Sequence, residues 1–245
     1  MILKDKRAVI TGGTGALGEL ICEVFAREGA SFVFTYHQNE KKAQTIIENL
    51  KKYDCRVIPF KLSLLDSAAI REMAGMAEKE LGGVDILVNN AGVTQVMPFP
   101  LIEEEDWDRI MDVNVKGYFL VTKEVVRGMI RRKSGSIVNI GSLAGHRLLE
   151  VPVHYAAAKA AISGFTLALS RELARYNIRV NNIVPGMLDS GIGKNVPEKQ
   201  YQEYLKYCMA GRPGKPAEVA ELVAFVASDK GSYVNSQNLF ADGGI

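Results

Sequence analysis

The sequence predicts an α/β fold, a single-domain doubly wound parallel sheet of Rossmann type with about seven strands and helices on both faces. Two observations predict it. Short β-branched runs alternate with longer helical segments from one end of the chain to the other. A glycine-rich turn also joins the first strand to the first helix. A length of 245 residues suits one α/β domain, so residues 1–245 are expected to form a single unit.

The elements follow in order along the chain. Strands are expected at Ala8–Thr11, Phe32–Tyr36, Arg56–Phe60, Ile86–Asn89, Ser136–Ile140, Arg179–Val184 and Asn238–Ala241. Helices are expected at Ala16–Glu28, Lys41–Lys52, Ser67–Leu81, Glu105–Arg132 (with a bend near Asn114), Val153–Tyr176 and Ala217–Ser228. Right-handed crossovers between such units give the doubly wound sheet.

One stretch, 185–216, is too long for an ordinary strand–helix connection and predicts a substrate lid at about 186–215. Its apolar residues are either pocket walls or the packing face of a helix. They are Met187, Leu188, Ile192, Tyr201, Tyr204, Leu205, Tyr207 and Met209.

Composition excludes several classes of function. A formal net charge of +2 gives no reason to expect a nucleic acid or a membrane surface as partner. Charges near the N-terminus argue against a signal peptide, and no stretch reads as a membrane span. The three cysteines lie far apart without metal-ligand spacing, which predicts reduced thiols, no metal site and a cytoplasmic protein.

Two glycine-containing turns are candidates for a binding site. Thr11-Gly-Gly-Thr-Gly-Ala-Leu-Gly18 lies between a strand and a helix, where glycines let the backbone approach a pyrophosphate at the helix N-terminus. Asn89-Asn-Ala-Gly92 ends the fourth strand, at the edge where parallel sheets bind ligands. Taken alone, either segment could be an ordinary turn.

Tyr155, Lys159 and Ser142 form a candidate catalytic group. Tyr155 and Lys159 are four residues apart in an Ala-rich helical stretch, so they share a face. Lowering the pKa of a tyrosine from about 10 to about 7 takes about 4 kcal/mol. One cation about 4 Å away, at an effective dielectric near 20, supplies that much. Lys159 is therefore expected to lower the Tyr155 pKa, and Ser142 to hold a substrate oxygen. The alternative is a surface Tyr and Lys on an amphipathic helix.

With these motifs in this order, the chain resembles the short-chain dehydrogenase/reductase family over essentially its whole length. The resemblance extends to Asn114-Val-Lys-Gly117, Pro185-Gly186, Arg212-Pro-Gly214 and Asp242-Gly-Gly244. Within the family it is most similar to the 3-oxoacyl-[acyl-carrier-protein] reductase group.

The resemblance implies a role for each matching residue. Tyr155 exchanges a proton with the carbonyl or alcohol oxygen, and Ser142 hydrogen-bonds that oxygen. Lys159 lowers the tyrosine pKa and binds the nicotinamide ribose, while Asn114 holds a relay water. The implied cofactor-binding residues are Gly12, Thr14, Gly15, Ala16, Leu17, Gly18, Tyr36, His37, Ser63, Leu64, Asn90, Ala91, Gly92, Tyr155, Lys159, Pro185, Gly186, Leu188 and Ser190. Ile140 also lies on the nicotinamide side.

The implied activity is NADP(H)-dependent reduction of a ketone to a secondary alcohol, with a 3-oxoacyl thioester as the favoured substrate. One alternative is a dehydrogenase or reductase of a free alicyclic, steroid-like or sugar ketone or alcohol, with NAD(H) as an alternative cofactor. The other is a cofactor-binding protein without turnover. His146 and His154 flank the site and are expected to serve as pocket or packing residues.

Three residues depart from the family pattern. Ala16 replaces the middle glycine of the usual turn, which predicts a shifted loop that still binds cofactor. Ser63 replaces an acidic residue that usually contacts adenine. Ser236 replaces a glycine near the C-terminus, which puts the local backbone geometry in question.

Cofactor choice depends on the end of the second strand. An NAD-specific site places a carboxylate there, whereas this chain has Tyr36-His37-Gln-Asn39 followed by Lys41 and Lys42. The missing carboxylate and the nearby cations favour NADP(H). Glu40 is the one acid nearby, and it is expected to begin a helix, where an acid is favourable.

The two long helices carry more apolar positions than one sheet face requires, which predicts a homo-oligomer, tetramer before dimer. These positions are Val115, Phe119, Val121, Val125, Ala161, Phe165, Leu167 and Leu169. The resemblance implies a four-helix contact and a second contact through the C-terminal strand. Acyl carrier protein is a further possible partner, although Arg131-Arg-Lys133 is read as a solvated helix end rather than as its docking patch.

Overall fold

A computed structural model describes residues 1–147, 149–191, 193 and 196–245. Seven parallel strands form one sheet in the order β3-β2-β1-β4-β5-β6-β7, as expected for a doubly wound fold. The strands are β1 (Arg7–Ile10), β2 (Ser31–Tyr36), β3 (Val57–Lys61), β4 (Ile86–Asn89), β5 (Gly135–Ile140), β6 (Ile178–Pro185) and β7 (Asn238–Ala241). The strand order reverses between β1 and β4, which places a ligand crevice at their carboxyl ends.

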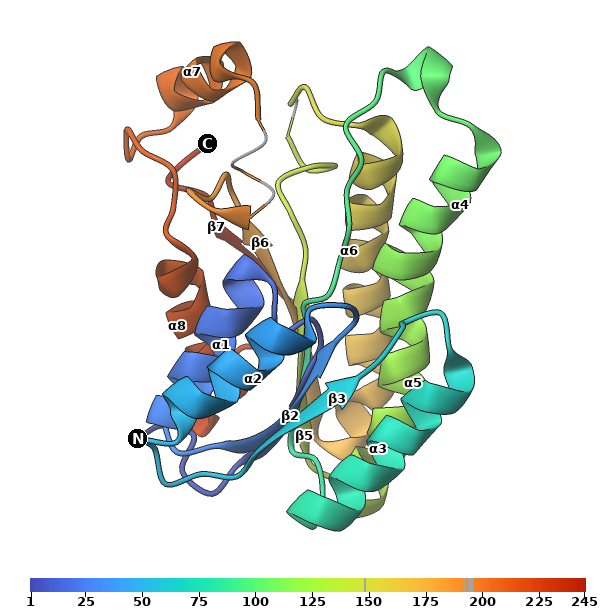
Figure 1. The fold of residues 1–245 in the computed structure, drawn as a ribbon, viewed down its shortest axis with the longest axis vertical. Coiled ribbons are helices and arrows are strands. Elements are labelled where there is room, and N and C mark those ends of the chain that lie inside the picture. The colour runs from blue at the N-terminus through green and yellow to red at the C-terminus, as the bar shows by residue number, and fades with distance from the viewer. Residues whose placement is uncertain (148, 192, 194–195) are drawn as a thin grey trace.

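Helices cover both faces of the sheet (Figure 1). One face carries α1 (Ala16–Arg27), α2 (Glu40–Leu50) and α8 (Pro216–Ala227). The other face carries α3 (Ser67–Leu81), α5 (Gly117–Arg132) and α6 (Val153–Leu173), with α4 (Glu104–Met111) packed beside α6.

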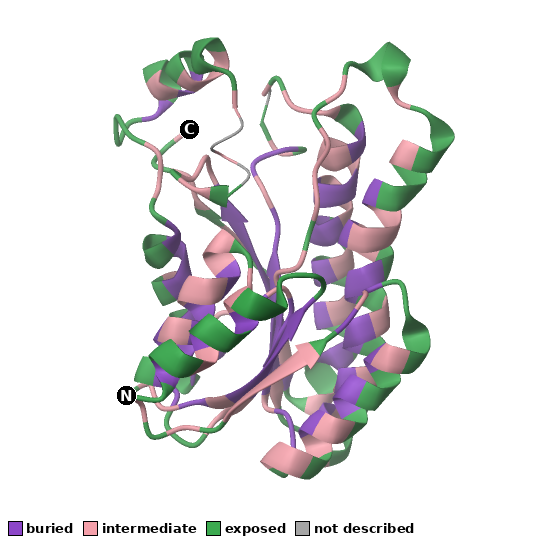
Figure 2. Cartoon of the chain, viewed as in Figure 1, coloured by how far each residue is buried: buried purple, intermediate pink, exposed green. Residues whose placement is uncertain are grey.

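Successive side chains along each strand point to opposite faces of the sheet and so fill two hydrophobic cores. In β1, Ala8 and Ile10 pack under α1 and α8, whereas Val9 packs under α3 and α5. Residues of the inner strands are mostly buried, whereas the edge strand β3 is half-buried and the outer sides of the helices are exposed, as Figure 2 shows. This pattern is typical of a parallel sheet covered on both sides.

The helix expected at Glu105–Arg132 is interrupted where a bend was predicted. Between α4 and α5, residues Asp112–Lys116 form a π-helical turn, and the Gly117 N–H bonds to the Asp112 oxygen. Such turns often occur at functional sites, and this one contains Asn114.

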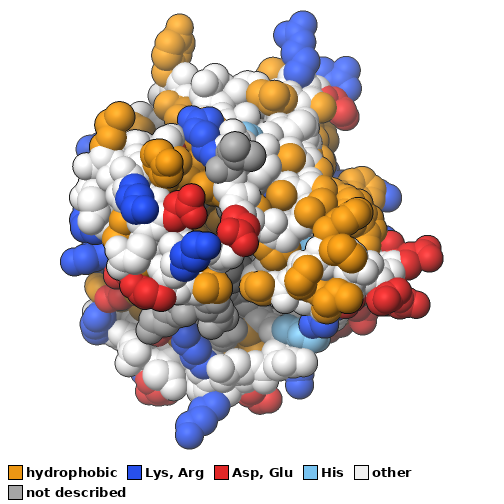
Figure 3. Space-filling model, turned by 90° about the horizontal axis from the view of Figure 1, so that it is seen from above, with side chains coloured by type: hydrophobic (Ala, Val, Ile, Leu, Met, Phe, Trp, Pro, Cys, Tyr) orange, Lys and Arg blue, Asp and Glu red, His pale blue; other side chains and the backbone are white. Residues whose placement is uncertain are grey.

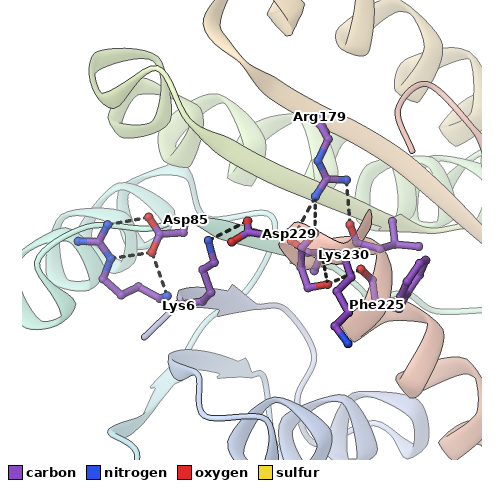
Figure 4. A network of polar contacts seen from close by, with 10 residues as sticks. Lys6, Asp85, Arg179, Phe225, Asp229 and Lys230 are labelled. Carbon is purple, nitrogen blue, oxygen red and sulfur yellow. Dashed lines mark hydrogen bonds and ion pairs between the residues drawn. The ribbon is translucent and has the colours of Figure 1, made fainter. Parts of the chain in front are cut away.

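The amino ends of the strands are held together by polar contacts (Figure 4). Arg179 donates to the carbonyl oxygens of Val226, Ala227 and Ser228 at the C-terminal end of α8, at 2.8, 3.3 and 3.0 Å. Lys6 pairs with Asp229 at 3.0 Å. A guanidinium suits the negative end of a helix dipole, so these contacts fix α8 against the sheet. They lie at the end of the molecule opposite the carboxyl edge.

The segment after β6 is partly helical, with α7 (Glu198–Tyr207) lying above the carboxyl ends of the strands. Leu188 pairs with Gly214 in a short bridge, which closes the base of the segment. Tyr204 of α7 is buried, whereas Tyr207 and Met209 are 71% and 90% exposed. Ile192, one of the expected pocket walls, lies outside the described residues.

In the part of the chain that the structure describes, the helices are too short or too polar to cross a membrane.

Candidate active site

Tyr155 and Lys159 both lie in the first two turns of α6, as expected. Lys159 is 4% exposed, and its Nζ donates to the Ile140 oxygen at the end of β5, at 2.8 Å. Its Nζ also lies 5.9 Å from the centroid of the Tyr155 ring. The lysine is therefore a buried cation beside the half-buried tyrosine, at the carboxyl edge of the sheet.

Burial decides the ionisation of both side chains. It lowers the pKa of Lys159 from 10.5 to about 8. It raises the pKa of Tyr155, and the nearby Ser142 hydroxyl offsets this in part. The expected lowering of the Tyr155 pKa by Lys159 is therefore wrong for the protein alone. The ammonium faces the tyrosine ring and bonds to a carbonyl oxygen, and desolvation by burial has the largest effect on the phenol's pKa.

Ser142 lies in the loop that follows β5, and its Oγ accepts a hydrogen bond from the Ala144 N–H at 3.1 Å. The Ser142 hydroxyl lies close enough to the phenol to lower the Tyr155 pKa. Two hydroxyls from different elements, one on a loop and one on a helix, thus converge where a carbonyl oxygen could bind.

Asn114 is fully buried beneath Gly92. Its Nδ2 donates to the oxygens of Val93 and Ile110, both at 2.9 Å, and its Oδ1 accepts from the Val93 N–H at 3.1 Å. A Cβ on Gly92 would lie 2.6 Å from Asn114 Oδ1 and 3.6 Å from Lys159 Nζ. The amide oxygen and the ammonium therefore approach the same point of the backbone, and only glycine fits there.

Tyr118 was not foreseen as part of the site. It is fully buried, and its hydroxyl donates to the Ile140 oxygen at 3.2 Å. Lys159 Nζ lies 5.6 Å from its ring centroid. Because Tyr118 follows Asn114 by four residues, helical spacing could have indicated that both face the same side.

The glycine-rich turn has the tight geometry expected for close approach to a phosphate. Gly12 has φ +69°, and a Cβ there would lie 2.8 Å from the Ala91 Cα. A Cβ on Gly18 would overlap the Gly12 oxygen. Gly15 is the N-cap of α1 and Ala16 is its first residue, so alanine is accommodated in helical geometry at the place of the usual glycine. The N–H groups of the first turn remain without a side-chain cap at Gly15.

Thr11 and Asn90 lock this turn to the end of β4. Thr11 Oγ1 accepts from the N–H groups of Asn90 and Ala91 at 2.9 and 3.1 Å. Asn90 Nδ2 donates to the oxygens of Thr11 and Gly12 at 2.9 and 3.2 Å. The glycine-rich turn and the turn after β4 are therefore joined by hydrogen bonds. Leu17 packs on the hydrophobic core beneath them.

The ends of β2 and β3 bound the other side of the crevice. Tyr36 is buried and His37 exposed, and Asn39 caps α2 by accepting from the Lys42 N–H at 3.0 Å. Glu40 begins α2, as expected. Lys42 Nζ pairs with Glu19 of α1 at 2.8 Å, a contact between distant segments that the sequence did not indicate.

After β3, Ser63 Oγ accepts from the Leu65 N–H at 3.3 Å. Leu64 is buried, and a Cβ on Gly117 would lie 2.9 Å from its Cβ. The nearby acid, Asp66, caps α3 by accepting from the Ala68 and Ala69 N–H groups, at 2.9 and 3.0 Å. Its carboxylate is therefore committed to that helix, so it does not replace the acid missing at Ser63.

The expected lid residues lie beside the turn. The Gly186 N–H donates to the Ala241 oxygen at 3.0 Å. The Leu143 N–H, from the loop after β5, donates to the Pro185 oxygen, also at 3.0 Å. A Cβ on Gly191 would lie 3.2 Å from the Ala16 Cβ, so this segment reaches the glycine-rich turn, with Leu188 packed against the adjoining core. Ser190 Oγ is buried, and it has no hydrogen-bond partner among the described residues. A bound polar group would satisfy that hydroxyl, and the uncapped N–H groups after Thr14 and Gly15 could bind a phosphate, so the residues present fit a dinucleotide.

The family of the chain follows from comparison with known proteins. A family model described as short chain dehydrogenase matches residues 6–201. The chain belongs to the short-chain dehydrogenase/reductase family and is an oxidoreductase of that class.

Curated relatives match along the whole length. The chain is 37% identical over 245 residues to 3-oxoacyl-[acyl-carrier-protein] reductase FabG of Thermotoga maritima, covering 100% of this chain and 99% of that one. It is 35% identical over 243 residues to Nodulation protein G of Rhizobium meliloti, covering 99% and 98%. Among solved structures, a short chain dehydrogenase from Burkholderia cenocepacia in complex with NADP superimposes with a TM-score of 0.92 at 30% identity, covering 100% and 99%. These similarities confirm the predicted family and fold.

Proposed function

We propose that this protein catalyses the NADP(H)-dependent reduction of a ketone to a secondary alcohol, with a 3-oxoacyl thioester as substrate. The observation that carries the proposal is the meeting of the Tyr155 phenol, the Ser142 hydroxyl and the buried Lys159 ammonium at the carboxyl edge of the sheet. Full-length similarity to relatives named as 3-oxoacyl-[acyl-carrier-protein] reductases supports the substrate class.

Tyr155 acts as the proton donor. Burial raises its pKa, so the phenol is protonated at neutral pH, as a general acid for carbonyl reduction must be. The Ser142 hydroxyl donates a hydrogen bond to the substrate oxygen and holds it within reach of the Tyr155 O–H. When bound, the nicotinamide supplies the hydride that the carbonyl carbon accepts.

Lys159 and Asn114 support the tyrosinate that forms after proton transfer. With a pKa of about 8, Lys159 is mostly charged at neutral pH, and its ammonium stabilises the anion. The Asn114 Oδ1 and the Lys159 Nζ both approach Gly92, so a water between them could bond to both. Such a water would return a proton to the tyrosine after each turnover.

The chain would hold the dinucleotide in three places. The N–H groups at the start of α1 receive the pyrophosphate, with Gly12 and Gly18 allowing close approach. Asn90, Ala91 and Gly92 line the adenosine side. Pro185 to Ser190 contact the nicotinamide, where the Ser190 hydroxyl gains a partner.

NADP(H) is favoured over NAD(H) because residues 36–39 contain no carboxylate, and because His37 is exposed and followed four residues later by the exposed Lys41. The relative from Burkholderia cenocepacia, solved with NADP, supports this choice. The ion pair between Lys42 and Glu19 reduces the share of Lys42 in binding a 2′-phosphate, so His37 and Lys41 carry most of that role.

Acyl carrier protein could present the substrate, but the Arg131–Lys133 cluster does not suit its docking. This cluster ends α5 just before the start of β5, at the edge of the sheet away from Tyr155. Arg132 is also engaged by Glu78 at 2.8 Å and by the Val84 oxygen at 2.6 Å. Exposed apolar side chains lie instead at the active-site end, among them Val96, Phe99 and Leu101 between β4 and α4 (Figure 3).

We propose that the protein is a homotetramer. An apolar groove between α5 and α6 is lined by Phe119, Val126, Ile130, Phe165 and Leu169. Phe119 and Leu167 are 47% and 45% exposed, which favours a partner helix pair over this face. Val121 and Val125 are buried within the subunit's own core, so among the apolar positions of α5 they belong to the face that packs on the sheet.

The second contact would use β7, the last strand at one edge of the sheet. Ser236, just before it, adopts φ +62°, the left-handed geometry that favours glycine. Its hydroxyl is hydrogen-bonded to the Ser170 hydroxyl at an Oγ–Oγ distance of 2.8 Å, and this bond helps hold the turn in that conformation. The substitution of serine for glycine therefore leaves the approach to β7 intact.

An NADPH-oxidation screen tests the proposal. Purified protein should consume NADPH with acetoacetyl-CoA. It should also consume NADPH with longer 3-oxoacyl thioesters, at rates that depend on chain length. Consumption with cyclic ketones alone would favour the free-ketone alternative. Binding of NADPH without consumption for any substrate would favour a cofactor-binding protein without turnover.

A further inference from the structure

His146 lies in the loop that carries Ser142, and its ring is bonded to the helix that carries Tyr155. The His146 Nε2 is 2.8 Å from the Ser163 Oγ of α6. Ser163 follows Lys159 by four residues and Tyr155 by eight, so all three lie along one side of α6. A single side-chain contact thus joins the loop of one hydroxyl to the helix of the other.

The same serine is bonded from the sheet. Asn182 of β6 donates from Nδ2 to Ser163 Oγ at 3.1 Å and to Asn238 Oδ1 of β7 at 2.9 Å. A Cβ on Gly141 would lie 2.7 Å from Asn182 Oδ1, so the asparagine also fills the space under the start of the Ser142 loop. His146, Ser163 and Asn182 therefore form a polar chain that runs from the loop through α6 to the sheet.

The loop itself has little freedom. Gly145 has φ +84°, and a Cβ there would lie 2.6 Å from the Ala156 oxygen. The His146 N–H bonds to the Leu143 oxygen at 2.9 Å, and the His146 ring packs edge-on against Phe240 at a centroid distance of 5.4 Å. The turn after Ser142 therefore packs closely against α6 at Gly145, and the His146 side chain is hydrogen-bonded to α6.

We propose that His146 is a positioning residue for the reduction, which sets the separation of the Ser142 and Tyr155 hydroxyls through its bond to Ser163. This inference rests on the proposed function, since Ser142 and Tyr155 are assigned there to one substrate oxygen. A misplacement of about 1 Å in a reacting group can cost up to about a hundredfold in rate. His146 touches no reacting atom, so it acts only through the loop.

The test compares His146→Leu, which removes the bond but keeps an apolar side chain against Phe240, with Ser163→Ala. Each should lower kcat by about tenfold while the KM for NADPH changes by less than about twofold, because the glycine-rich turn and Lys159 are untouched. The double variant should lose little more kcat than the more damaging single variant, because both substitutions remove the same contact between His146 and Ser163. His146→Gln, whose amide can still reach Ser163, should recover part of the rate lost in His146→Leu.

Ser170→Ala is the matched control. Ser170 lies on the same helix and is buried, and its hydroxyl is hydrogen-bonded to the Leu167 oxygen and to the Ser236 hydroxyl, both at 2.8 Å and away from the site. This variant loses a comparable buried hydrogen bond, so its thermal stability should fall about as far as that of Ser163→Ala. Its kcat should stay within about twofold of the parent.

A second readout does not depend on turnover. The protein has three histidines, so imidazole ¹H–¹⁵N spectra are simple to assign. Ser163→Ala should shift the His146 resonances and Ser170→Ala should not. If the unmodified protein reduces no ketone, the proposed function is refuted. The spectra would still test the contact between His146 and Ser163. If the parent is active, any of three results would overturn the inference. The kcat of His146→Leu could stay within about twofold of the parent, or the losses in kcat of His146→Leu and Ser163→Ala could add up in the double variant. The third is that the His146 resonances do not shift in Ser163→Ala.

Discussion

We expect the buried Lys159 to destabilise the free protein, and Lys159→Met measures by how much. A fall of the pKa from 10.5 to about 8 corresponds to about 3 kcal/mol, since each pKa unit is worth about 1.4 kcal/mol. The carbonyl oxygen of Ile140 keeps a donor in the variant, because the Tyr118 hydroxyl also bonds to it. A methionine fills nearly the same volume. We expect Lys159→Met to raise the free energy of unfolding at pH 7 by about 2 kcal/mol, net of the lost lysine bond, and to abolish turnover.

The pH dependence gives the sign of the effect. Because the folded-state pKa lies below the unfolded-state pKa, the unfolded chain binds more protons between about pH 8 and 10.5. The penalty is therefore complete below about pH 8 and fades as the pH rises toward 10.5. The stability advantage of Lys159→Met over the parent should shrink across this window.

Urea unfolding of the cofactor-free protein at several pH values measures both quantities. Lys79→Met, at an exposed position on α3, is the control and should change stability by less than about 0.5 kcal/mol. A Lys159→Met protein no more stable than the parent at pH 7, or one whose advantage does not shrink with pH, would refute the view that Lys159 is held charged against a desolvation cost.

Three further predictions concern the cofactor and the assembly. Gly18→Ala places a methyl group on the Gly12 oxygen, so the Kd for NADPH, measured by fluorescence titration, should rise at least about tenfold; unchanged affinity would contradict the phosphate role of this turn. His37→Asp puts a carboxylate where NAD-specific sites have one, so the ratio of Kd for NADH to Kd for NADPH should fall; a constant ratio would exclude His37 from cofactor choice. Phe119→Glu adds a charge to the apolar groove on α5, so light scattering should report smaller assemblies, and an unchanged oligomer would place the interface elsewhere.

The fold could be predicted from the sequence because each local signal agreed with the whole. The glycine-rich turn, the β-branched strands and the positions of Tyr155 and Lys159 all indicate one parallel sheet with its site at the carboxyl edge. Short-range rules also gave Glu40 as a helix start and a break near Asn114. These features depend on neighbours in the sequence, which is why the sequence contains them.

Features that depend on distant residues could not be predicted in the same way. The pKa of Tyr155 is set by how deeply the fold buries it, so reasoning from Lys159 alone gave the wrong direction. The ion pair between Lys42 and Glu19 joins two helices. Ser236 keeps the geometry of a glycine through a bond to Ser170, 66 residues away in sequence.

The central claim is that Tyr155 donates the proton in ketone reduction. Its most direct test compares the parent with Tyr155→Phe in NADPH oxidation with acetoacetyl-CoA, alongside NADPH binding by fluorescence. Phenylalanine keeps the ring and removes only the hydroxyl. We expect kcat to fall by about 10²–10⁴ with the Kd for NADPH nearly unchanged. A variant whose kcat stays within about tenfold of the parent would contradict the assignment of Tyr155 as the acid.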